Sequence, residues 1–230
     1  MKVDFSHAPP QFRLYVDVGT SVGAPHSADW LLGDPMAFVV GIEPSPVNCA
    51  ILKAGRKDPI ARNHLHVGDG NIVNGTTICG KINHRFTLLE CAIDDVDQKQ
   101  HKDFYLTDER NTGCSSLLKP TPKLELEVVD VIKVPTLPLA SVLDTVPWSR
   151  CAGVVEMLKV DTQGRDLSVL RSAGDYLEDN VRVVKIEYTT FGSYEGEHTP
   201  EELDEFMGDL PFVLEASDDS DRVYRNLNLR

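Results

Sequence analysis

Apolar residues along the chain form short runs that alternate with segments of helical periodicity. Apolar runs of about four to eight residues are typical of buried strands, whereas apolar positions three and four residues apart are typical of one helix face. Strands that alternate with helices indicate an α/β fold with a doubly wound, mostly parallel sheet and right-handed crossovers. The pattern predicts strands at residues 12–18, 38–43, 86–93, 154–160 and 182–186, and helices at 25–33, 46–54, 139–146, 165–177 and from Thr199 onward.

Two polar regions interrupt this alternation and predict insertions in the sheet. Residues 56–85 are rich in Gly, Asn and His, which indicates a loop or a small β-ribbon. Residues 96–137 contain apolar segments at 104–106 and 124–132. These segments predict antiparallel strands that are added to the core of the fold.

The C-terminal pattern predicts how the sheet ends, and the length and composition predict a single globular domain. Segments 212–215 and 222–227 predict an antiparallel hairpin that closes the sheet. Because no internal repeat or linker divides the chain, we expect a single domain over residues 1–230. Hydrophobic residues at 41% and charged residues at 26% are ordinary for a globular chain with a sizeable core.

The net charge of −13 argues against partners that carry a strong negative charge. A nucleic-acid backbone or an anionic membrane surface attracts clustered basic residues, so we expect neither as a partner. No apolar stretch approaches the ~18 residues that span a bilayer, and the N-terminus lacks the apolar core of a signal peptide. Five widely spaced cysteines without a Cys-x-x-Cys pair indicate reduced thiols. We therefore expect a cytoplasmic protein.

The first two predicted strands lead into a candidate cofactor site. In a parallel α/β sheet, the first strand delivers a tight glycine turn under an adenosine-type cofactor. A carboxylate at the end of the second strand accepts hydrogen bonds from both ribose hydroxyls, which predicts this role for Glu43. The candidate residues are Asp17, Gly19, Thr20 and Gly23 after the first strand, and Glu43 and Pro44 after the second.

The spacing of the glycines indicates which cofactor binds. Asp17-x-Gly19-x-x-x-Gly23 differs from the Gly-x-Gly-x-x-Gly motif that brings backbone N–H groups onto a pyrophosphate. A carboxylate at Asp17 would repel a phosphate and suits a cationic ligand. S-adenosylmethionine has no phosphate and carries a sulfonium and an ammonium group. A similar glycine turn also occurs in α/β proteins that bind no cofactor, and Glu43 is the feature that favours a cofactor here.

Asp161 and Glu187 are candidate catalytic residues. Each ends a predicted strand at the carboxyl edge, where α/β sheets place their ligands. Paired carboxylates raise one another's pKa and can supply a general base. Alternatively, either acid caps the helix or turn that follows it. Lys159 lies on the same side of its strand as Asp161, so it is a third candidate that pairs with Asp161 or Glu187.

Two histidines in the first polar region resemble part of a metal site. His64 and His66 lie two residues apart, so on an extended segment they share one face, and Asp69 follows. No further strong ligand lies nearby in the sequence, so we expect no bound metal.

Residues 156–174 read Glu-Met-Leu-Lys-Val-Asp-Thr-Gln-Gly-Arg-Asp-Leu-Ser-Val-Leu-Arg-Ser-Ala-Gly. This segment resembles the signature block of FkbM-type methyltransferases, whose usual form is Leu-Lys-Ile-Asp-x-x-Gly-x-Glu-x-x-Val-Leu-x-Gly-Ala. The chain departs from that form at Asp166, where Glu is common, and at Ser172, where Gly is common. The resemblance spans roughly residues 14–190, and further pieces follow in the family order: Asp17-Val-Gly19, Glu43-Pro44, Ala92-Ile93-Asp94 and Lys185-Ile-Glu187.

The resemblance implies a Rossmann-like sheet of the class I methyltransferase type, with S-adenosylmethionine as the cofactor. It further implies O-methylation of a hydroxyl on a sugar or secondary metabolite. Asp17 is then expected under the methionine moiety, Asp161 beside the transferred methyl group, and Asp94 or its neighbour Asp95 at the adenine amino group. Two other classes stay open: a nicotinamide-dependent oxidoreductase on a similar sheet, and a non-catalytic cofactor-binding protein.

Overall fold

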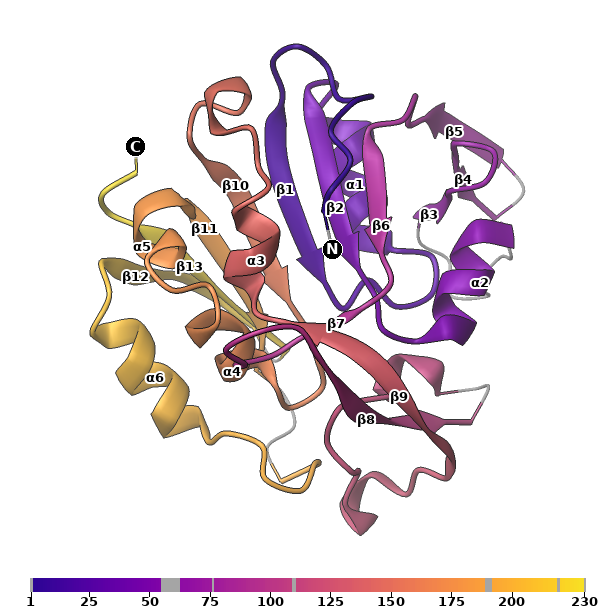
Figure 1. The fold of residues 1–230 in the computed structure, drawn as a ribbon, viewed down its shortest axis with the longest axis vertical. Helices are drawn as coiled ribbons and strands as arrows, with labels where there is room; N and C mark the ends of the chain where they lie inside the picture. The colour runs from indigo at the N-terminus through magenta and orange to yellow at the C-terminus, as the bar shows by residue number, and fades with distance from the viewer. Residues whose placement is uncertain are drawn as a thin grey trace.

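A seven-stranded sheet forms the centre of the computed structural model (Figure 1). The structure describes residues 2–54, 63–75, 77–108, 111–188, 192–218 and 220–229. The strand order is β12-β13-β11-β10-β1-β2-β6, in which the strands from β11 to β6 are parallel. β13 runs antiparallel to both β11 and β12. The strands are β1 (Arg13–Val18), β2 (Ala37–Ile42), β6 (Phe86–Leu89), β10 (Val155–Val160), β11 (Val183–Glu187), β12 (Phe212–Ser217) and β13 (Asp221–Asn226).

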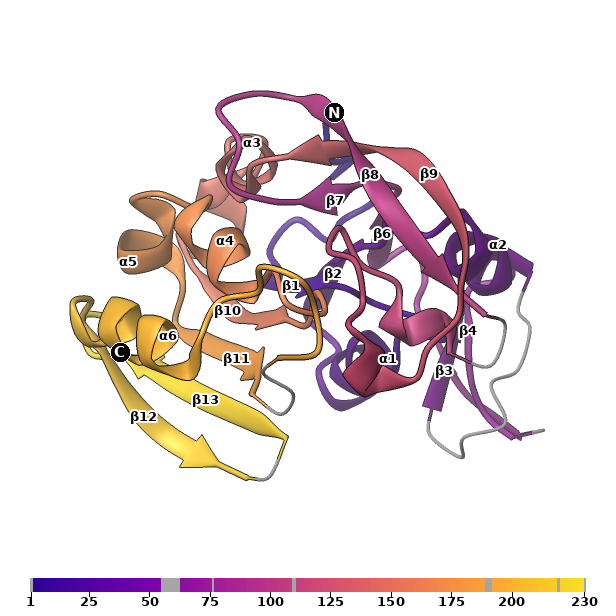
Figure 2. The same cartoon turned by 90° about the horizontal axis from the view of Figure 1, so that it is seen from below.

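Helices cover both faces of this parallel-rich α/β sheet (Figure 2). One face packs against α3, α4, α5 and α6, and the other against α1, with α2 beside it. Of the helices that the structure describes, none is long and apolar enough to cross a membrane. The helices are α1 (Pro25–Gly33), α2 (Pro46–Ala54), α3 (Leu139–Leu143), α4 (Asp166–Arg171), α5 (Tyr176–Asn180) and α6 (Pro200–Gly208).

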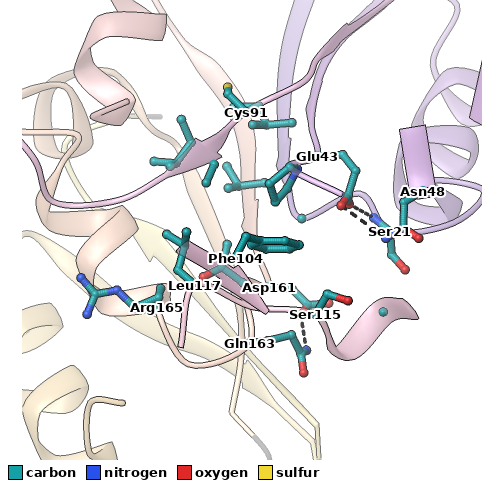
Figure 3. Close-up of a pocket in the computed structure, with 18 of the residues that line it drawn as sticks. Ser21, Glu43, Asn48, Cys91, Phe104, Ser115, Leu117, Asp161, Gln163 and Arg165 are labelled. Carbon is teal, nitrogen blue, oxygen red and sulfur yellow. Dashed lines mark hydrogen bonds between the residues drawn. The ribbon is translucent and has the colours of Figure 1, made fainter. Parts of the chain in front are cut away.

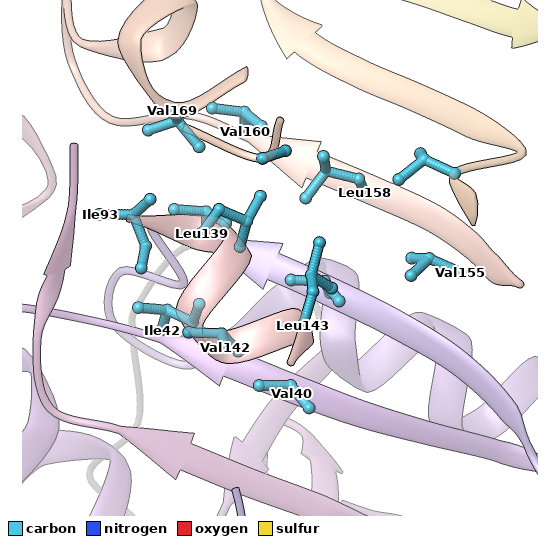
Figure 4. Close-up of a cluster of buried hydrophobic side chains, with 14 of the residues drawn as sticks. Val40, Ile42, Ile93, Leu139, Val142, Leu143, Val155, Leu158, Val160 and Val169 are labelled. Carbon is cyan, nitrogen blue, oxygen red and sulfur yellow. The ribbon is translucent and has the colours of Figure 1, made fainter. Parts of the chain in front are cut away.

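The alternation of side chains along the central strands explains why both faces are buried. In β2, Phe38, Val40 and Ile42 enter one core, whereas Val39 enters the other. On the first face, Leu143 and its neighbours in α3 pack over the strands (Figure 4). Each fully buried leucine of this kind contributes about 1.5–3 kcal/mol through removal of its surface from water. The core therefore holds the carboxyl ends of the strands in fixed positions.

Two small sheets occupy the polar insertions. β3 (Asn63–His66), β4 (Asn71–Asn74) and β5 (Thr77–Lys81) form an antiparallel ribbon, which confirms the small ribbon expected there. β8 (Gln100–Thr107) pairs antiparallel with β9 (Val128–Leu137), and the short β7 (Ala92–Ile93) pairs parallel with β9. The predicted antiparallel additions are thus confirmed, although β9 begins at Val128. Residues 55–62, 76 and 109–110 of the insertions lie outside the described residues.

Two predicted elements are each divided in the structure. The strand expected over residues 86–93 is wrong as one element, because β6 ends at Leu89 and β7 joins another sheet. The helix expected over residues 165–177 is divided into α4 and α5. At this break the Ser172 hydroxyl donates to the Val169 carbonyl (2.7 Å), and Gly174 adopts a φ of 56°. A side chain that bonds the preceding turn and a left-handed glycine together end a helix.

Candidate functional site

A pocket lies at the carboxyl ends of β1, β2 and β10 (Figure 3). Parallel α/β sheets place their ligands at this edge, because the loops that leave neighbouring strands diverge there. The second insertion forms the opposite wall through Phe104 of β8 and through residues 111–117, which we call the strap. The lining includes Gly19, Ser21, Glu43, Pro44, Asn48, Cys91, Ala92, Ile93, Phe104, Thr112, Gly113, Ser115, Leu117, Asp161, Thr162, Gln163 and Arg165.

The turn after β1 packs too tightly for a side chain at two positions, Gly19 and Gly23. Gly19 has a φ of 79°, and a Cβ atom there would lie 1.8 Å from the Asp161 carbonyl oxygen. Gly23 has a φ of 82°, and its Cβ would lie 2.6 Å from His64 Nδ1. Gly19 thus lines the pocket as predicted, whereas Gly23 allows the turn to pack on the first insertion. Thr20 is buried behind the turn.

Glu43 presents a fixed carboxylate to the pocket. Its Oε2 accepts the Ser21 N–H (2.8 Å), and its Oε1 accepts the Ser45 N–H (2.9 Å). Burial raises the pKa of Glu43 to about 7, although the bonds from Ser45 and Ser21 oppose this rise. Because a carboxylate has about four acceptor positions, these two backbone donors and the Asn48 amide (3.3 Å) leave about one position for a ligand's hydroxyl group. Glu43 thus lines the pocket, and its contact with a cofactor ribose stays a prediction.

Asn48 adds an acceptor that the sequence pattern did not indicate. Its Nδ2 lies 3.3 Å from both Glu43 Oε1 and the Thr112 carbonyl oxygen. Only the nitrogen of the amide can donate to a carboxylate, so the Oδ1 faces away from Glu43. Within the described part of the chain this buried Oδ1 has no hydrogen-bond partner. The sequence signal is modest: a polar residue in the first turn of the helix after Glu43-Pro44.

A buried ion network lies behind the pocket wall. Lys159 Nζ donates to the Gly19 carbonyl oxygen (2.6 Å) and lies 3.4 Å from Asp17 Oδ1 and 3.3 Å from Asp161 Oδ2. Burial opposes the charge of Lys159, but the carboxylates of Asp161 and Asp17 outweigh it and raise the pKa of Lys159. A lysine held in its charged form is a poor general base. These contacts suit charge compensation rather than the catalytic role predicted for Lys159.

Asp17 belongs to the same buried network. It is 1% exposed, and its Oδ2 accepts the Ser27 hydroxyl (2.6 Å). The pocket is lined by Gly19 in front of it. Asp17 itself is not among the residues that line the pocket in this structure, and its role toward a cofactor stays a prediction.

Asp161 and Glu187 lie close together, as the sequence predicted. Gln163 Nε2 donates to Asp161 Oδ1 and to Glu187 Oε2, each at 2.8 Å. Burial favours protonation of Asp161, but Lys159 and the hydrogen bonds with Gln163 and Glu187 hold its pKa below the ordinary value. Asp161 is thus an ionised carboxylate at the pocket wall. The bridging residue Gln163 was not predicted, because its role depends on the course of a loop.

Asp94 lies outside the pocket lining and already has cationic partners. It is 1% exposed and forms ion pairs with Lys102 (2.5 Å) and Arg165. Its neighbour Asp95 is exposed on the surface. This geometry disfavours the expected contact of Asp94 with an adenine amino group. The apolar wall formed by Ile93 and Phe104 is better placed to contact a flat ring.

The histidines of the first insertion lie away from the pocket lining. His64 is buried against Gly23, and His66 Nδ1 lies 3.9 Å from Asp69. In the residues that the structure describes, no group of three or more His, Cys, Asp or Glu side chains is arranged to hold a metal ion.

Comparison with known proteins defines the class. Residues 17–224 match the family model of the methyltransferase FkbM domain. The protein therefore belongs to the FkbM methyltransferase family, which confirms the resemblance found in the sequence, and family membership supports a methyltransferase.

Among solved structures, the chain is similar to the crystal structure of methyltransferase FkbM from Methylobacillus flagellatus KT. The sequence identity is 16% and the TM-score is 0.46 over 94% of this chain. The chain spans 44% of the length of that protein. No curated protein matches the sequence.

Proposed function

We propose that this protein is an S-adenosylmethionine-dependent O-methyltransferase that acts on a hydroxyl of a small molecule or sugar. The observation that carries the proposal is the Glu43 carboxylate, which two backbone N–H groups fix at the pocket wall. The strand order, with antiparallel β13 next to β11, supports a Rossmann-like sheet of the class I methyltransferase type. The net charge of −13 supports a small-molecule acceptor over a nucleic acid.

The polar atoms of the pocket fit the adenosine part of this cofactor. Glu43 is suited to the ribose hydroxyls, and the unpartnered Oδ1 of Asn48 supplies a further acceptor for a ribose hydroxyl or an adenine amino group. Cys91 to Ile93 and Phe104 form an apolar slot suited to adenine. Gly19 allows the closest approach of backbone at the methionine end.

The acidic residues suit the chemistry of the acceptor. S-adenosylmethionine, when bound, supplies the transferred methyl group. A hydroxyl is a weak nucleophile at neutral pH, and a positioned base accelerates its reaction by typically about 10²–10⁴-fold. Asp161, whose pKa is held low, suits orientation of the hydroxyl rather than acceptance of its proton. As the group that receives the proton we propose Glu187, which shares the Gln163 amide with Asp161 and lies just outside the residues that line the pocket.

Positioning supplies the rest of the rate enhancement. Holding two reactants in contact removes up to about 7–11 kcal/mol of the barrier. The strap and Phe104 cover one side of the pocket, whereas the ends of β1 and β10 form the other. This enclosure is suited to holding an acceptor beside the methyl donor.

Calorimetric titration with S-adenosylmethionine, S-adenosylhomocysteine and NADH tests the cofactor. We expect both S-adenosyl compounds to bind and NADH not to bind; binding of NADH alone would establish the oxidoreductase alternative. Transfer of a labelled methyl group is then measured over a panel of hydroxylated sugars and metabolites. Tight cofactor binding without transfer to any acceptor would favour the non-catalytic alternative.

A further inference from the structure

Asn48 connects the Glu43 carboxylate to the loop that covers the pocket. Its Nδ2 lies 3.3 Å from Glu43 Oε1 and 3.3 Å from the Thr112 carbonyl oxygen of the strap, and Figure 3 shows Asn48 beside Glu43. An amide nitrogen carries two hydrogens, so it can donate one to each acceptor. One side chain of α2 thus joins the two walls of the pocket at the end where Glu43 lies.

The start of α2 holds Asn48 at this place. Ser45 precedes the helix, and its hydroxyl accepts the Asn48 backbone N–H (3.3 Å), which is the bond with which a serine caps a helix. Asn48 is 2% exposed, so its side chain has little freedom. A reversed amide would place its oxygen against the Thr112 carbonyl, which is an acceptor as well. The nitrogen therefore faces Thr112 and Glu43.

The strap is a compact loop that is braced by its own hydrogen bonds. The Asn111 carbonyl oxygen accepts the Thr107 hydroxyl (2.5 Å) and the Cys114 N–H (2.8 Å). The Ser115 hydroxyl accepts the Thr107 N–H (3.1 Å). Because these bonds link both ends of the loop, we expect the strap to turn as one piece rather than to unravel.

The strap is firmly attached on the side of Gln163. The Ser116 hydroxyl donates to the Gln163 carbonyl oxygen (2.7 Å), and the Cys114 carbonyl oxygen accepts the Tyr194 hydroxyl (2.8 Å). Ser116 and Tyr105 also exchange two backbone hydrogen bonds (2.8 and 3.2 Å). This side is therefore the anchor about which the strap can turn.

The attachment on the side of Glu43 is much slighter. Within the described residues, the contact from Asn48 to the Thr112 carbonyl is the one hydrogen bond that joins the strap to α2 or to the turn after β1. Gly113 rests closely on that turn, since a Cβ atom there would lie 3.2 Å from Ser21 Oγ. A ligand could therefore enter beside Glu43 at the cost of this single bond, with the anchored side left in place.

A ligand bound to Glu43 would strengthen the same contact. A ligand hydroxyl donates to the ionised form of the carboxylate, and a hydrogen bond to an ionised acceptor is roughly twice as strong as one between neutral groups. The Asn48 amide would then be held by Glu43 with its second hydrogen directed at Thr112. Because coupling between two equilibria is reciprocal, the closed strap would in turn strengthen binding of the ligand.

We propose that Asn48 is a positioning residue that couples binding of the cofactor to closure of the strap over the pocket. This inference rests on the proposed function, which supplies the ligand hydroxyl on Glu43. It deepens that function by assigning an order of binding. The acceptor meets a closed pocket wall only after the cofactor is bound.

Hydrogen exchange of the strap amides, measured by mass spectrometry on the full chain, tests the coupling. Peptides that span residues 111–117 are followed with and without saturating S-adenosylhomocysteine. In the wild type the ligand should slow their exchange about fivefold or more. In Asn48→Leu, which keeps a similar volume and removes both donors, the ligand should slow exchange less than about twofold. Equal slowing in the two proteins would overturn the proposal, as would a wild-type strap that the ligand leaves unchanged.

Two further variants separate the coupling from a general loosening of the strap. Ser115→Ala removes a brace within the strap but leaves the Asn48 contact intact. Its strap should exchange faster without ligand and should still be slowed by the ligand as in the wild type. Asn48→Ser is too short to reach Thr112, so it should behave as Asn48→Leu does and serves if that variant does not fold. Full slowing in Asn48→Ser would contradict the proposal.

Calorimetry on the same preparations separates this inference from the proposed function. Asn48→Leu should raise the dissociation constant of S-adenosylhomocysteine about 3- to 10-fold, the effect of one hydrogen bond. If the wild type does not bind this ligand, the proposed function fails. Exchange without ligand then decides whether Asn48 holds the strap, since it should be faster in Asn48→Leu than in the wild type. If both proteins bind equally tightly and their straps respond alike, the inference alone fails.

Discussion

Lys159 Nζ lies 3.3 Å from Asp161 Oδ2, and both groups project to the same side of β10. The lysine side chain is 6% exposed and that of Asp161 is 34% exposed. One partner is thus buried in the protein and the other reaches the pocket. The charge of the buried lysine keeps the pocket carboxylate ionised. A residue outside the pocket lining thus determines the chemical state of one that lines it.

Loss of this lysine should destabilise the fold. Lys159→Met leaves Asp17 buried without its cation, and breaking a buried pair by removal of one partner costs about 3–5 kcal/mol. Urea unfolding measures the change in the free energy of unfolding. The double variant Lys159→Met with Asp17→Asn should recover part of it, because the uncompensated charge is then removed. A single variant as stable as the wild type would show that Lys159 does not compensate these acids.

Removal of the Glu43 carboxylate should weaken cofactor binding. Hydrogen bonds to a charged acceptor contribute about 1.5–3 kcal/mol, so Glu43→Ala should raise the dissociation constant of S-adenosylhomocysteine about 10- to 150-fold. The fold should persist, since Glu43 follows the end of β2. Glu43→Gln serves as the matched control that retains volume. An unchanged dissociation constant in both variants would remove Glu43 from the site.

The raised pKa of Glu43, about 7, predicts a pH-dependent affinity. Ribose hydroxyls need the ionised acceptor, so the free protein must lose a proton on binding when the pH is below about 7. The affinity for S-adenosylhomocysteine should therefore rise by up to about tenfold per pH unit below that pH and level off above it. Titration in two buffers of different ionisation enthalpy measures the proton release, which should be absent in Glu43→Gln.

The raised pKa of Glu43 also predicts how the free energy of unfolding changes with pH. The ordinary pKa of 4.5 is raised to about 7 in the folded chain, so the unfolded chain loses the proton first. Glu43 consequently lowers stability progressively as the pH rises from about 4.5 to about 7. Relative to the wild type, Glu43→Gln should gain up to about 3 kcal/mol in unfolding free energy across this window. A constant difference between the two proteins would contradict the shift.

Amide substitution of either candidate acid should lower turnover, but only Glu187→Gln should change its pH dependence. Glu187→Gln removes the proposed base, so turnover with an identified acceptor should fall about 10²-fold or more. The decline in turnover at acid pH, which protonation of the base causes, should also disappear. Asp161→Asn keeps volume and loses the orienting charge; turnover should fall by about 10²-fold, with a much smaller change in cofactor affinity. Near-normal turnover in Glu187→Gln would transfer the role of base to Asp161.

Methyl transfer should be insensitive to chelators. His64 is buried against Gly23, and His66 is near only one acid among its described neighbours, Asp69. Activity is measured before and after EDTA treatment and dialysis. Activity that is lost in EDTA and restored by a single divalent ion would disprove this expectation.

Much of the central sheet follows from local sequence features. Apolar runs and helical spacing identify β1, β2, β10 and β11, since these patterns arise from burial on both faces. Glu43, Asp161 and Glu187 were predictable because the end of a strand is a position that the sequence itself marks. The family block at 156–174 identified the same edge of the sheet.

The partners of these residues were not predictable in the same way. Asp94 pairs with Arg165, 71 positions later in the chain, and this distance is bridged only when the sheets pack. Gln163 reaches two acids because its backbone is left-handed, which a glutamine does not signal. The break between α4 and α5 depends on the Ser172 hydroxyl bonding the turn before it. Each of these outcomes is decided by tertiary geometry rather than by local propensity.

Gly19 in the turn after β1 packs directly on the Asp161 carbonyl at the end of β10, so these two segments of the pocket wall depend on each other. A side chain at residue 19 would collide with that oxygen, so the turn could move only by pushing the end of β10 away. The turn after β1 and the end of β10 are therefore mechanically joined and cannot be altered separately at this point. Substitutions intended to alter acceptor preference should therefore be made in the strap, for example at Leu117 and Thr112, and Gly19 should be left unchanged.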